Sequence, residues 1–331
     1  MGKNNSKPKT PTPIYSPEIY RDKILEFLKK SVNYPPGIPS LIFEFLGQPS
    51  GTIMAKFPIN PESKEKMPET IMVHITTDSE GYIYIADQLN NYIKVFLTNG
   101  TFVRKWGRYG SGDSEFSEIR GISIGLNGLL YVVDSGNRQI KIFKKDGTFV
   151  KKRNCSYRPH GITCQNHLIY VIYYNSYEID IRSSDGDIIK IVSICPESEY
   201  FFRPALICCN NGEVYVMIES FSTDILIYSM SGNIIKKIPR QQAISRCGIY
   251  PAFSLTCNPY GIIYYTTEEG ICKINEIGEI TLIFEKINSL CLNKTNVFNS
   301  EYRSLSGVKY GQDGFLYFFN PSEQCIMVMS V

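Results

Sequence analysis

The sequence lacks the patterns that mark several common protein classes. Its 331 residues hold three histidines and one tryptophan, and no apolar run approaches the roughly 20 residues that a membrane-spanning helix needs. The N-terminus also lacks the apolar core of a secretory signal. These absences argue against a membrane-spanning helix and against the usual secretory route. We therefore expect a cytoplasmic protein, with membrane association left open by the leader discussed below.

The cysteines and the net charge narrow the classes further. No two of the ten cysteines form a Cys-x-x-Cys pair, and their spacing is not that of a small disulfide-bonded domain. We interpret them as reduced thiols. The formal net charge of +3 is small for this length, so the protein as a whole is not expected to attract nucleic acid or an anionic membrane. A charged partner would therefore have to be bound by a local cluster of charged side chains.

One pattern of strands and turns recurs six times along the chain. Each copy has an apolar segment, a glycine turn, a strand with a central tyrosine, a loop, an apolar strand, a second turn and a fourth strand. The tyrosine keeps one register, at Tyr84, Tyr131, Tyr170, Tyr215, Tyr264 and Tyr317. We expect these rings to pack in the core. Self-similarity at a period of about 40 to 50 residues is typical of a propeller.

The second turn of the repeat carries dipeptides that favour two-residue hairpins with positive φ. They are Asn99-Gly100, Asp146-Gly147, Asp185-Gly186 and Ser231-Gly232. Each repeat is therefore predicted to be a four-stranded antiparallel blade.

The last blade needs a strand from elsewhere. The sixth copy stops at Val331 after its third strand, which would leave an unpaired edge. The segment Gly37–Gly47 copies the glycine-turn and fourth-strand pattern, and the first strand of the first blade is expected near Ile71 to Thr76. The sequence thus predicts an all-β fold, a six-bladed β-propeller over residues 37–331 that is closed by an N-terminal strand.

Residues 1–15 form a basic leader that we expect to be disordered. Gly2 and Ser6 satisfy the Met-Gly-x-x-x-Ser pattern for N-myristoylation of Gly2, and this N-terminus resembles those of myristoylated neuronal calcium sensors. Lys3, Lys7 and Lys9 could supply the second signal that stable membrane binding requires. The alternative is a solubilising tail.

Residues 16–36 are predicted to form a short helix and a linker. Ser16 is a suitable N-cap and Pro17 a suitable first helical residue. One face of the helix is apolar and comprises Tyr20, Ile24, Phe27 and Leu28. We expect that face to pack on the propeller, with contact to a membrane or a partner as the alternative.

The first two blades carry a recognisable motif set. It includes Gly-x-Ile-Tyr-x-Ala-Asp from Gly81, Asn-x-x-Ile-x-Val-Phe from Asn90 and Val-Asp-Ser-Gly-Asn-Arg-Gln-Ile from Val133. The stretch Asp78–Phe143 resembles NHL repeats. That resemblance implies a six-bladed propeller, and the family includes propellers that bind RNA through a basic face as well as related amidating lyases. From the third blade onward the Asp and the Asn-Arg pair of the motif are lost.

Two kinds of loop should share one rim of the propeller: those joining second to third strands, and those joining a fourth strand to the next first strand. The longest inter-blade loops are expected at 47–69 and 286–304. The second and third blades are locally basic, with only Asp146 opposed, at Arg138, Lys141, Lys144, Lys145, Lys151, Lys152, Arg153 and Arg158, and those that end fourth strands or start first strands should share this rim. Further basic residues extend the patch, at Arg104, Lys105, Arg108, Arg120 and Arg203.

The patch has three interpretations. It could bind an acidic protein or a lipid headgroup, or it could bind single-stranded RNA. Alternatively, strand alternation simply places Lys141 and Lys151 on a solvated face.

An enzymatic alternative depends on the histidines. His160 begins a first strand near the mouth of the central channel, His74 is one register position away on another first strand, and His167 falls in a turn. Two histidines without a clear third ligand make a weak zinc site. Acidic residues do not repeat at channel positions as a calcium site would need. We therefore expect no metal, no cofactor and no catalytic residues.

Two further constellations are interpreted as structural. Cys164, Cys208 and Cys257 are assigned to one equivalent first-strand position, occupied by Ile124 and Thr77 in other blades, and are expected to pack between blades. The pairs Asp87 with Asn90 and Asp134 with Asn137 are expected to brace loops by hydrogen bonds.

The main hypothesis is a monomeric, non-catalytic propeller scaffold that binds a protein partner through its loop rim, at a membrane surface if Gly2 is acylated. The alternatives are a metal-dependent lyase or hydrolase of the amidating-lyase or lactonase type, and an RNA-binding propeller. The predicted binding residues are Arg108, Arg120, Arg138, Lys151, Lys152, Arg153, Arg158, His160 and Arg203. The abundance of Ile, Asn, Lys and Tyr is typical of an AT-rich genome, such as that of a giant DNA virus or a protist.

Overall fold

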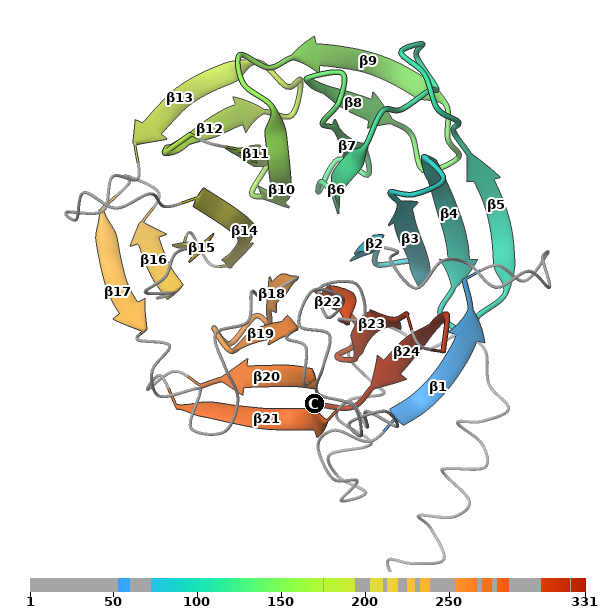
Figure 1. The fold of residues 1–331 in the computed structure, drawn as a ribbon, viewed down its shortest axis with the longest axis vertical. Coiled ribbons are helices and arrows are strands. Elements are labelled where there is room, and N and C mark those ends of the chain that lie inside the picture. Colours follow the sequence, from blue (N-terminus) through green and yellow to red (C-terminus); the bar gives the residue numbers. More distant parts are fainter. Residues whose placement is uncertain are drawn as a thin grey trace, which may run out of the picture.

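The computed structural model describes residues 53–59, 73–174, 176–193, 203–210, 213–219, 225–229, 233–238, 254–266, 270–275, 279–285, 305–321 and 323–331. The strands within these ranges form six four-stranded antiparallel sheets, arranged around a ring like the blades of a propeller (Figure 1). No helix among the described residues is long and apolar enough to cross a membrane.

In each blade the first strand lies nearest the axis of the ring and the fourth lies at the outer edge (Figure 1). The first three blades are formed by β2 (Val73–Thr77), β3 (Tyr82–Asp87), β4 (Tyr92–Leu97) and β5 (Phe102–Trp106); by β6 (Ile119–Ile124), β7 (Leu130–Asp134), β8 (Gln139–Phe143) and β9 (Phe149–Asn154); and by β10 (Pro159–Gln165), β11 (Leu168–Tyr173), β12 (Glu178–Ser183) and β13 (Ile188–Ser193).

The last three blades follow the same order. They are formed by β14 (Arg203–Asn210), β15 (Glu213–Glu219), β16 (Ile225–Ser229) and β17 (Ile234–Ile238); by β18 (Leu255–Cys257), β19 (Ile263–Thr266), β20 (Gly270–Ile274) and β21 (Ile280–Glu285); and by β22 (Ser306–Tyr310), β23 (Leu316–Asn320), β24 (Cys325–Met329) and β1 (Ile53–Pro58). The innermost strand of each blade contacts those of its two neighbours, and β22 contacts β2, which completes the ring.

An N-terminal strand closes the ring as predicted, but it is not the predicted one. β1 pairs antiparallel with β24, and Phe57 lies opposite Ile326. The expected segment Gly37–Gly47 lies outside the described residues, and part of the expected loop 47–69 is this strand. Phe57 is buried against Phe96 of the first blade, with ring centroids 5.5 Å apart. Both segments have apolar side chains in a strand-like pattern, so the sequence pattern alone did not single out Ile53–Pro58.

Several other predictions concern residues that are not described. They are the leader with Gly2, Lys3, Lys7 and Lys9, the helix and linker 16–36, the loop 286–304 and the turn Ser231-Gly232.

The six repeated tyrosines pack in the core, as predicted. They occupy one position in the second strand of each blade, and none is more than 3% exposed. Several of their hydroxyls bond to neighbouring groups: Tyr84 donates to Asp78 (3.1 Å) and Tyr215 donates to Glu213 (2.8 Å). The amphipathic ring therefore fills the space between blades while its hydroxyl is satisfied.

The hairpins between third and fourth strands differ from the predicted two-residue type. In the first blade the amide of Gly100 donates to Leu97 O (2.9 Å), and the amide of Leu97 donates to Thr101 O (2.9 Å), so the loop has three residues. Gly100 has a φ of +86°, whereas Asn99 is not among the residues with positive φ. A register shift in the adjoining strands accompanies this turn, as in a three-residue loop with a glycine bulge.

Two buried ion pairs were not foreseen. Lys94 pairs with Asp87 (2.7 Å) in the first blade, and Lys141 pairs with Asp134 (2.8 Å) in the second. Lys141 was expected on a solvated face, but its side chain is fully buried. Lys141 lies on the third strand, and its ammonium reaches the carboxylate of Asp134 at the end of the neighbouring second strand. Its side chain therefore points into the protein and not to solvent.

The third blade has different residue types at the positions of these aspartates and lysines. Tyr173 stands where the other two blades have Asp87 and Asp134, and its hydroxyl bonds to Asp180, which stands where they have a lysine. Arg182 then balances the buried carboxylate of Asp180 (2.6 Å). In this blade a tyrosine and an aspartate thus replace the aspartate and the lysine of the other two blades, and their buried polar groups are again paired.

We predict that Lys141→Met lowers the free energy of unfolding by about 3–5 kcal/mol, because it leaves the carboxylate of Asp134 buried without its cation. Urea denaturation at neutral pH measures the change. Lys144 follows the same strand but is exposed, so Lys144→Met should change stability by less than about 0.5 kcal/mol. Equal effects of the two substitutions would contradict the prediction.

Candidate functional site at the inner end of the loop rim

The loops that join second to third strands, and those that join a blade to the next, lie at one end of the antiparallel sheets. We call this end the loop rim. In the first three blades its described residues are 88–91, 107–118, 135–138, 155–158, 174, 176 and 177. The innermost strands β2, β6 and β10 begin at this rim. Side chains from different blades can therefore meet here.

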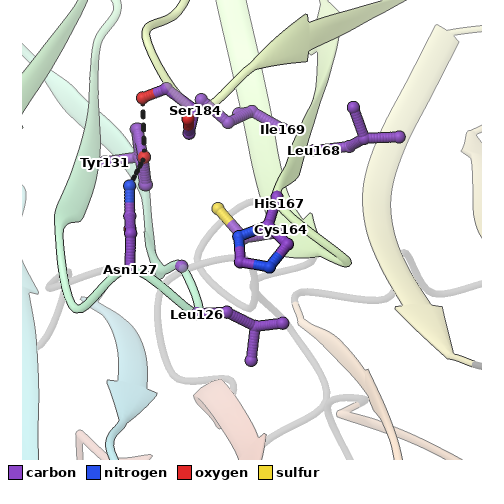
Figure 2. A pocket seen from close by; sticks show the side chains of 9 residues that line it. Leu126, Asn127, Tyr131, Cys164, His167, Leu168, Ile169 and Ser184 are labelled. Atoms are coloured by element: carbon purple, nitrogen blue, oxygen red, sulfur yellow. Dashed lines mark hydrogen bonds between the residues drawn. The ribbon is translucent and has the colours of Figure 1, made fainter.

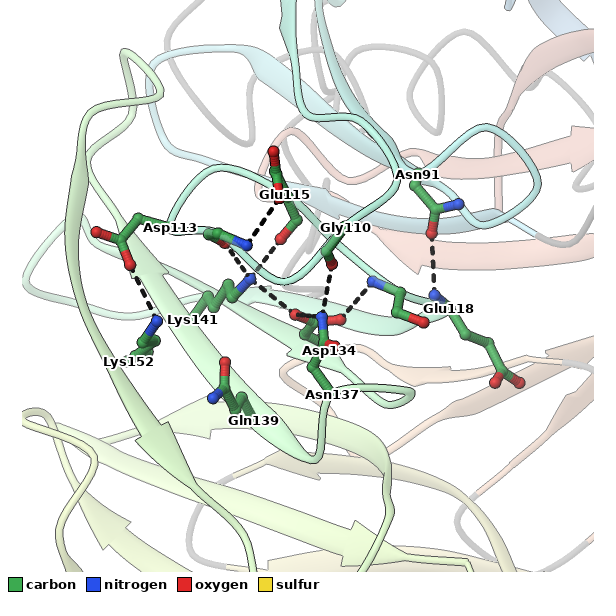
Figure 3. Close-up of polar contacts among 12 residues, drawn as sticks. Asn91, Gly110, Asp113, Glu115, Glu118, Asp134, Asn137, Gln139, Lys141 and Lys152 are labelled. Carbon is green, nitrogen blue, oxygen red and sulfur yellow. Dashed lines mark hydrogen bonds and ion pairs between the residues drawn. The ribbon is translucent and has the colours of Figure 1, made fainter.

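Residues of the second blade hold the loop 107–118 in place through hydrogen bonds (Figure 3). Lys141 Nζ donates to Gly112 O (2.7 Å) and to Glu115 O, in addition to its pair with Asp134. Asp134 accepts from the Ser117 amide (2.7 Å). The bracing role predicted for the Asp-Asn pairs is confirmed: Asn137 donates to Asp134 (2.8 Å), and Asn90 donates to Asp87 (3.0 Å). Asn137 also donates to Gly110 O (2.8 Å), which adds to the hold on this loop.

Glu118, at the end of this loop, has a backbone φ of +60°. That conformation is uncommon for a residue with a side chain and costs about 1–3 kcal/mol. It is maintained by two bonds: the Glu118 amide donates to Asn91 Oδ1 (2.9 Å), and its carbonyl accepts from the Ser135 amide (3.1 Å). The surrounding structure therefore sets the direction of this side chain.

The carboxylate of Glu118 is shared by two arginines from different blades. Arg120 donates to Oε1 through Nε (2.9 Å) and Nη2 (2.5 Å). Arg158 Nη2 pairs with Oε2, and its Nε donates to Ser135 Oγ (3.1 Å). Burial lowers the pKa of Arg120 from its usual value. Two guanidinium charges and one carboxylate leave this group with a charge of +1.

Two histidines lie beside these arginines. Burial, followed by the charges of Arg120 and Arg158, lowers the pKa of His160 to about 4. Burial, followed by the charges of His160 and Arg120, lowers the pKa of His74 to about 3. Both rings are thus neutral at pH 7. The ring of His160 also packs near Tyr174, with centroids 5.9 Å apart.

The structure therefore unites three of the predicted binding residues, Arg120, Arg158 and His160. It adds His74, which the sequence analysis had considered only as a metal ligand, and Glu118 and Tyr174, which it missed. We call these six residues the inner cluster. The sequence did carry a signal for this cluster. Arg120 and His160 each stand directly before a glycine, Gly121 and Gly161, at equivalent positions of two first strands.

The other predicted basic residues do not form a free patch. Those of β9 pair with acidic residues of neighbouring segments: Lys151 with Asp185, Lys152 with Asp113 (3.1 Å) and Arg153 with Asp187 (2.8 Å). The local sequence count missed these partners because they come from other parts of the chain.

Arg108 also has a partner, Glu115 (2.6 Å). Arg138 is exposed on the loop rim. Arg203 begins β14, and its side chain lies outside the described residues.

Exposed aromatic residues gather on the same rim, which the sequence analysis did not single out. Tyr109, Tyr157, Tyr174 and Tyr177 all lie in loops of the first three blades and are at least 39% exposed. Leu89, in the loop between β3 and β4, is also exposed. Together with the inner cluster and Arg138 they make one face that combines aromatic and cationic groups.

The remaining histidine lies at the opposite rim. Figure 2 shows His167 and Cys164 lining a small pocket there, beside Tyr131, which donates to Ser184 O (2.8 Å). Among the described residues, no group of three or more potential metal ligands of the His, Cys, Asp and Glu types lies close together.

One part of the cysteine prediction was wrong. The strand registers align Cys164 with Cys209 and Cys257, whereas Cys208 occupies the neighbouring position opposite Tyr215. The turn after the first strand differs in length: two residues separate the paired Asn210 and Glu213 in the fourth blade, whereas five separate Cys257 and Ile263 in the fifth, so the spacing to the tyrosine changes by one residue. Burial raises the pKa of the Cys164 and Cys209 thiols to about 12, so these groups stay protonated at neutral pH.

We predict that stability falls as the pH drops from about 6.5 towards about 4. The unfolded chain binds protons at His160 and His74 below about pH 6.5, whereas the folded protein excludes them until about pH 4 and about pH 3. His160→Gln should therefore lose part of this pH dependence in urea unfolding curves. His167→Gln, in an exposed turn, serves as the control. An unchanged slope for His160→Gln would disprove the role of this ring.

A family model described as a 6-bladed beta-propeller matches residues 65–193. No curated protein sequence matches the chain. Among solved structures, a catalytically inactive virginiamycin B lyase from Staphylococcus aureus, crystallised with quinupristin, is 15% identical over 82% of this chain and 82% of its own, with a TM-score of 0.57. Hydrazine synthase from Kuenenia stuttgartiensis is 11% identical over 81% and 79%, with a TM-score of 0.56.

The WD40 repeats of RRP9 are also similar, at 9% identity over 84% of this chain and 99% of that one, with a TM-score of 0.57. At these identities the likeness is one of fold. The six sheets and the family model together identify the chain as a six-bladed β-propeller.

Proposed function

We propose that this propeller is a binding module that docks a protein partner on the loop rim of its first three blades. The observation that supports this most is the gathering of exposed tyrosines around the inner cluster on one face. Tyrosine and arginine are enriched at protein interfaces and supply most of the binding hot spots. A tyrosine side chain offers a large contact area at a low cost in conformational entropy.

The construction of the rim supports the same proposal. The loop 107–118 is tied down by Lys141, Asp134 and Asn137, so that Tyr109 and Arg108 are presented on a rigid support. Preorganised loops lose less entropy on binding than mobile ones do.

RNA binding is less well supported, because Lys151, Lys152 and Arg153 each already have an acidic partner. Nucleic-acid affinity comes largely from cations that neutralise phosphates and release counterions. If RNA were the ligand, its affinity would fall steeply with salt. For a partner held mainly by tyrosines, we expect a weak salt dependence.

The test uses a photo-cross-linking amino acid placed in the full-length protein. Tyr109 on the loop rim is 76% exposed, and Tyr260, in the turn between β18 and β19 at the opposite rim, is 72% exposed. We predict that the probe at Tyr109 or Tyr157 cross-links one specific protein in extracts of the source cells, and that the probe at Tyr260 does not. Equal labelling from both rims would argue against the proposal.

We further predict that replacing Tyr109 and Tyr157 together by alanine weakens binding of that protein at least about tenfold, because each hot-spot truncation costs more than about 1 kcal/mol. Titration with the purified partner measures the Kd. Tyr260→Ala is the matched control and should bind like the unmodified protein. An unchanged Kd for the double variant would place the interface elsewhere.

A further inference from the structure

The inner cluster has more hydrogen-bond donors than its own acceptors use. Arg120 bonds through Nε and Nη2, and Arg158 likewise bonds through Nε and Nη2. Among the described residues, neither Nη1 group has an acceptor. Each guanidinium therefore has donors left for a ligand, in the planar geometry that suits a carboxylate.

His74 adds a second, independent observation. Its Nε2 is buried, and among the described residues it has no hydrogen-bond partner. An unsatisfied buried polar atom costs about 1–3 kcal/mol, and such atoms are uncommon in folded proteins. The ring lies close enough to His160 and Arg120 for their charges to lower its pKa. His74 and Arg120 stand on the neighbouring innermost strands β2 and β6, which contact each other.

The charge of the cluster selects among anions. With both histidines neutral, the two arginines and Glu118 sum to +1. One carboxylate neutralises that charge, whereas a phosphate group, at about −1.5 to −2 near neutral pH, would leave an excess of negative charge beside Glu118. Excess charge in a half-buried site is costly because the protein solvates it less well than water does.

From these observations we infer that the inner cluster binds a carboxylate group, held by Arg120 and Arg158, with His74 on the neighbouring strand. The strained backbone of Glu118 keeps a resident carboxylate between the two arginines when the site is empty. This inference deepens the proposed function, since the site lies at the inner edge of the docking face, and the carboxylate can belong to a partner chain or to a small acid.

The three histidines of the chain provide the readout. His74 and His160 lie in the inner cluster, and His167 lies at the opposite rim. We predict that N-acetylglycine, which carries one carboxylate, shifts the ring NMR signals of His74 and His160 saturably, with a Kd on the order of 1 mM, and leaves His167 in place. N-acetylglycinamide, the same molecule without the charge, should shift none of them.

A second arm distinguishes the two sources of the carboxylate. N-acetyl-aspartate amide presents the group as an acidic side chain within a chain would, and N-acetylglycine presents it as a chain end or a small acid would. Tighter binding of either one supports the inference and indicates the source. Signals that move with inorganic phosphate but with neither carboxylate would overturn it, and so would equal shifts with the uncharged amide.

Substitutions distinguish residues that bind the carboxylate from residues that only support the structure of the cluster. Arg120→Gln should abolish the shifts, and Arg138→Gln, at an exposed arginine of the same rim, should retain them. Glu118→Gln should tighten carboxylate binding about tenfold, because it removes the competing charge while keeping the side-chain shape. A merely structural role for Glu118 predicts weaker binding instead.

If Arg120→Gln fails to fold, as the His167 signal would show, Arg158→Gln gives the same test. The cross-linking at Tyr109 reports the docking of a partner, whereas the histidine signals report occupancy of the inner cluster. Failure of one measurement can therefore be told from failure of the other.

Discussion

The loop rim depends on the buried ion pair between Asp134 and Lys141. Burying two charges is costly unless every donor and acceptor finds a partner. Here Lys141 uses its ammonium on Asp134, Gly112 O and Glu115 O, and Asp134 also accepts from Ser117 and Asn137. Apart from Asn137, the partners of this pair belong to the loop between the first and second blades. The same contacts that offset the cost of burial therefore hold the loop that ends at Glu118.

The first three blades solve one structural problem in two ways. Blades one and two bury a carboxylate at the end of the second strand against a lysine of the third strand, whereas blade three buries a tyrosine against an aspartate that Arg182 neutralises. Both solutions leave the buried group satisfied. The sequence motif changes, but the spacing of the strands and the position of the loop rim are kept.

The ring geometry brings together residues that are far apart in the sequence. His74, Arg120 and His160 begin the innermost strands of three successive blades, and the loops before β6 and β10 supply Glu118 and Arg158. The exposed tyrosines of the loop rim lie in these loops and in the loop between β11 and β12. A face with a polar centre and an aromatic surround fits the docking of a protein that presents an acidic group, which is the function we propose.

Sequence by itself determined the repeated blade, the buried tyrosines, the need for a closing strand and the bracing of the loops by Asp87 and Asp134. These features follow from local patterns: the period of two in a strand, the glycine at a turn and side chains that bond within a few residues. Only the tertiary structure decided that Ile53–Pro58 closes the ring and that Lys141 is buried. It also decided that the basic side chains of β9 are neutralised and that the inner cluster is assembled. Each of these outcomes depends on contacts between different blades, whose partners are fixed by packing across the ring and not by neighbours in the chain.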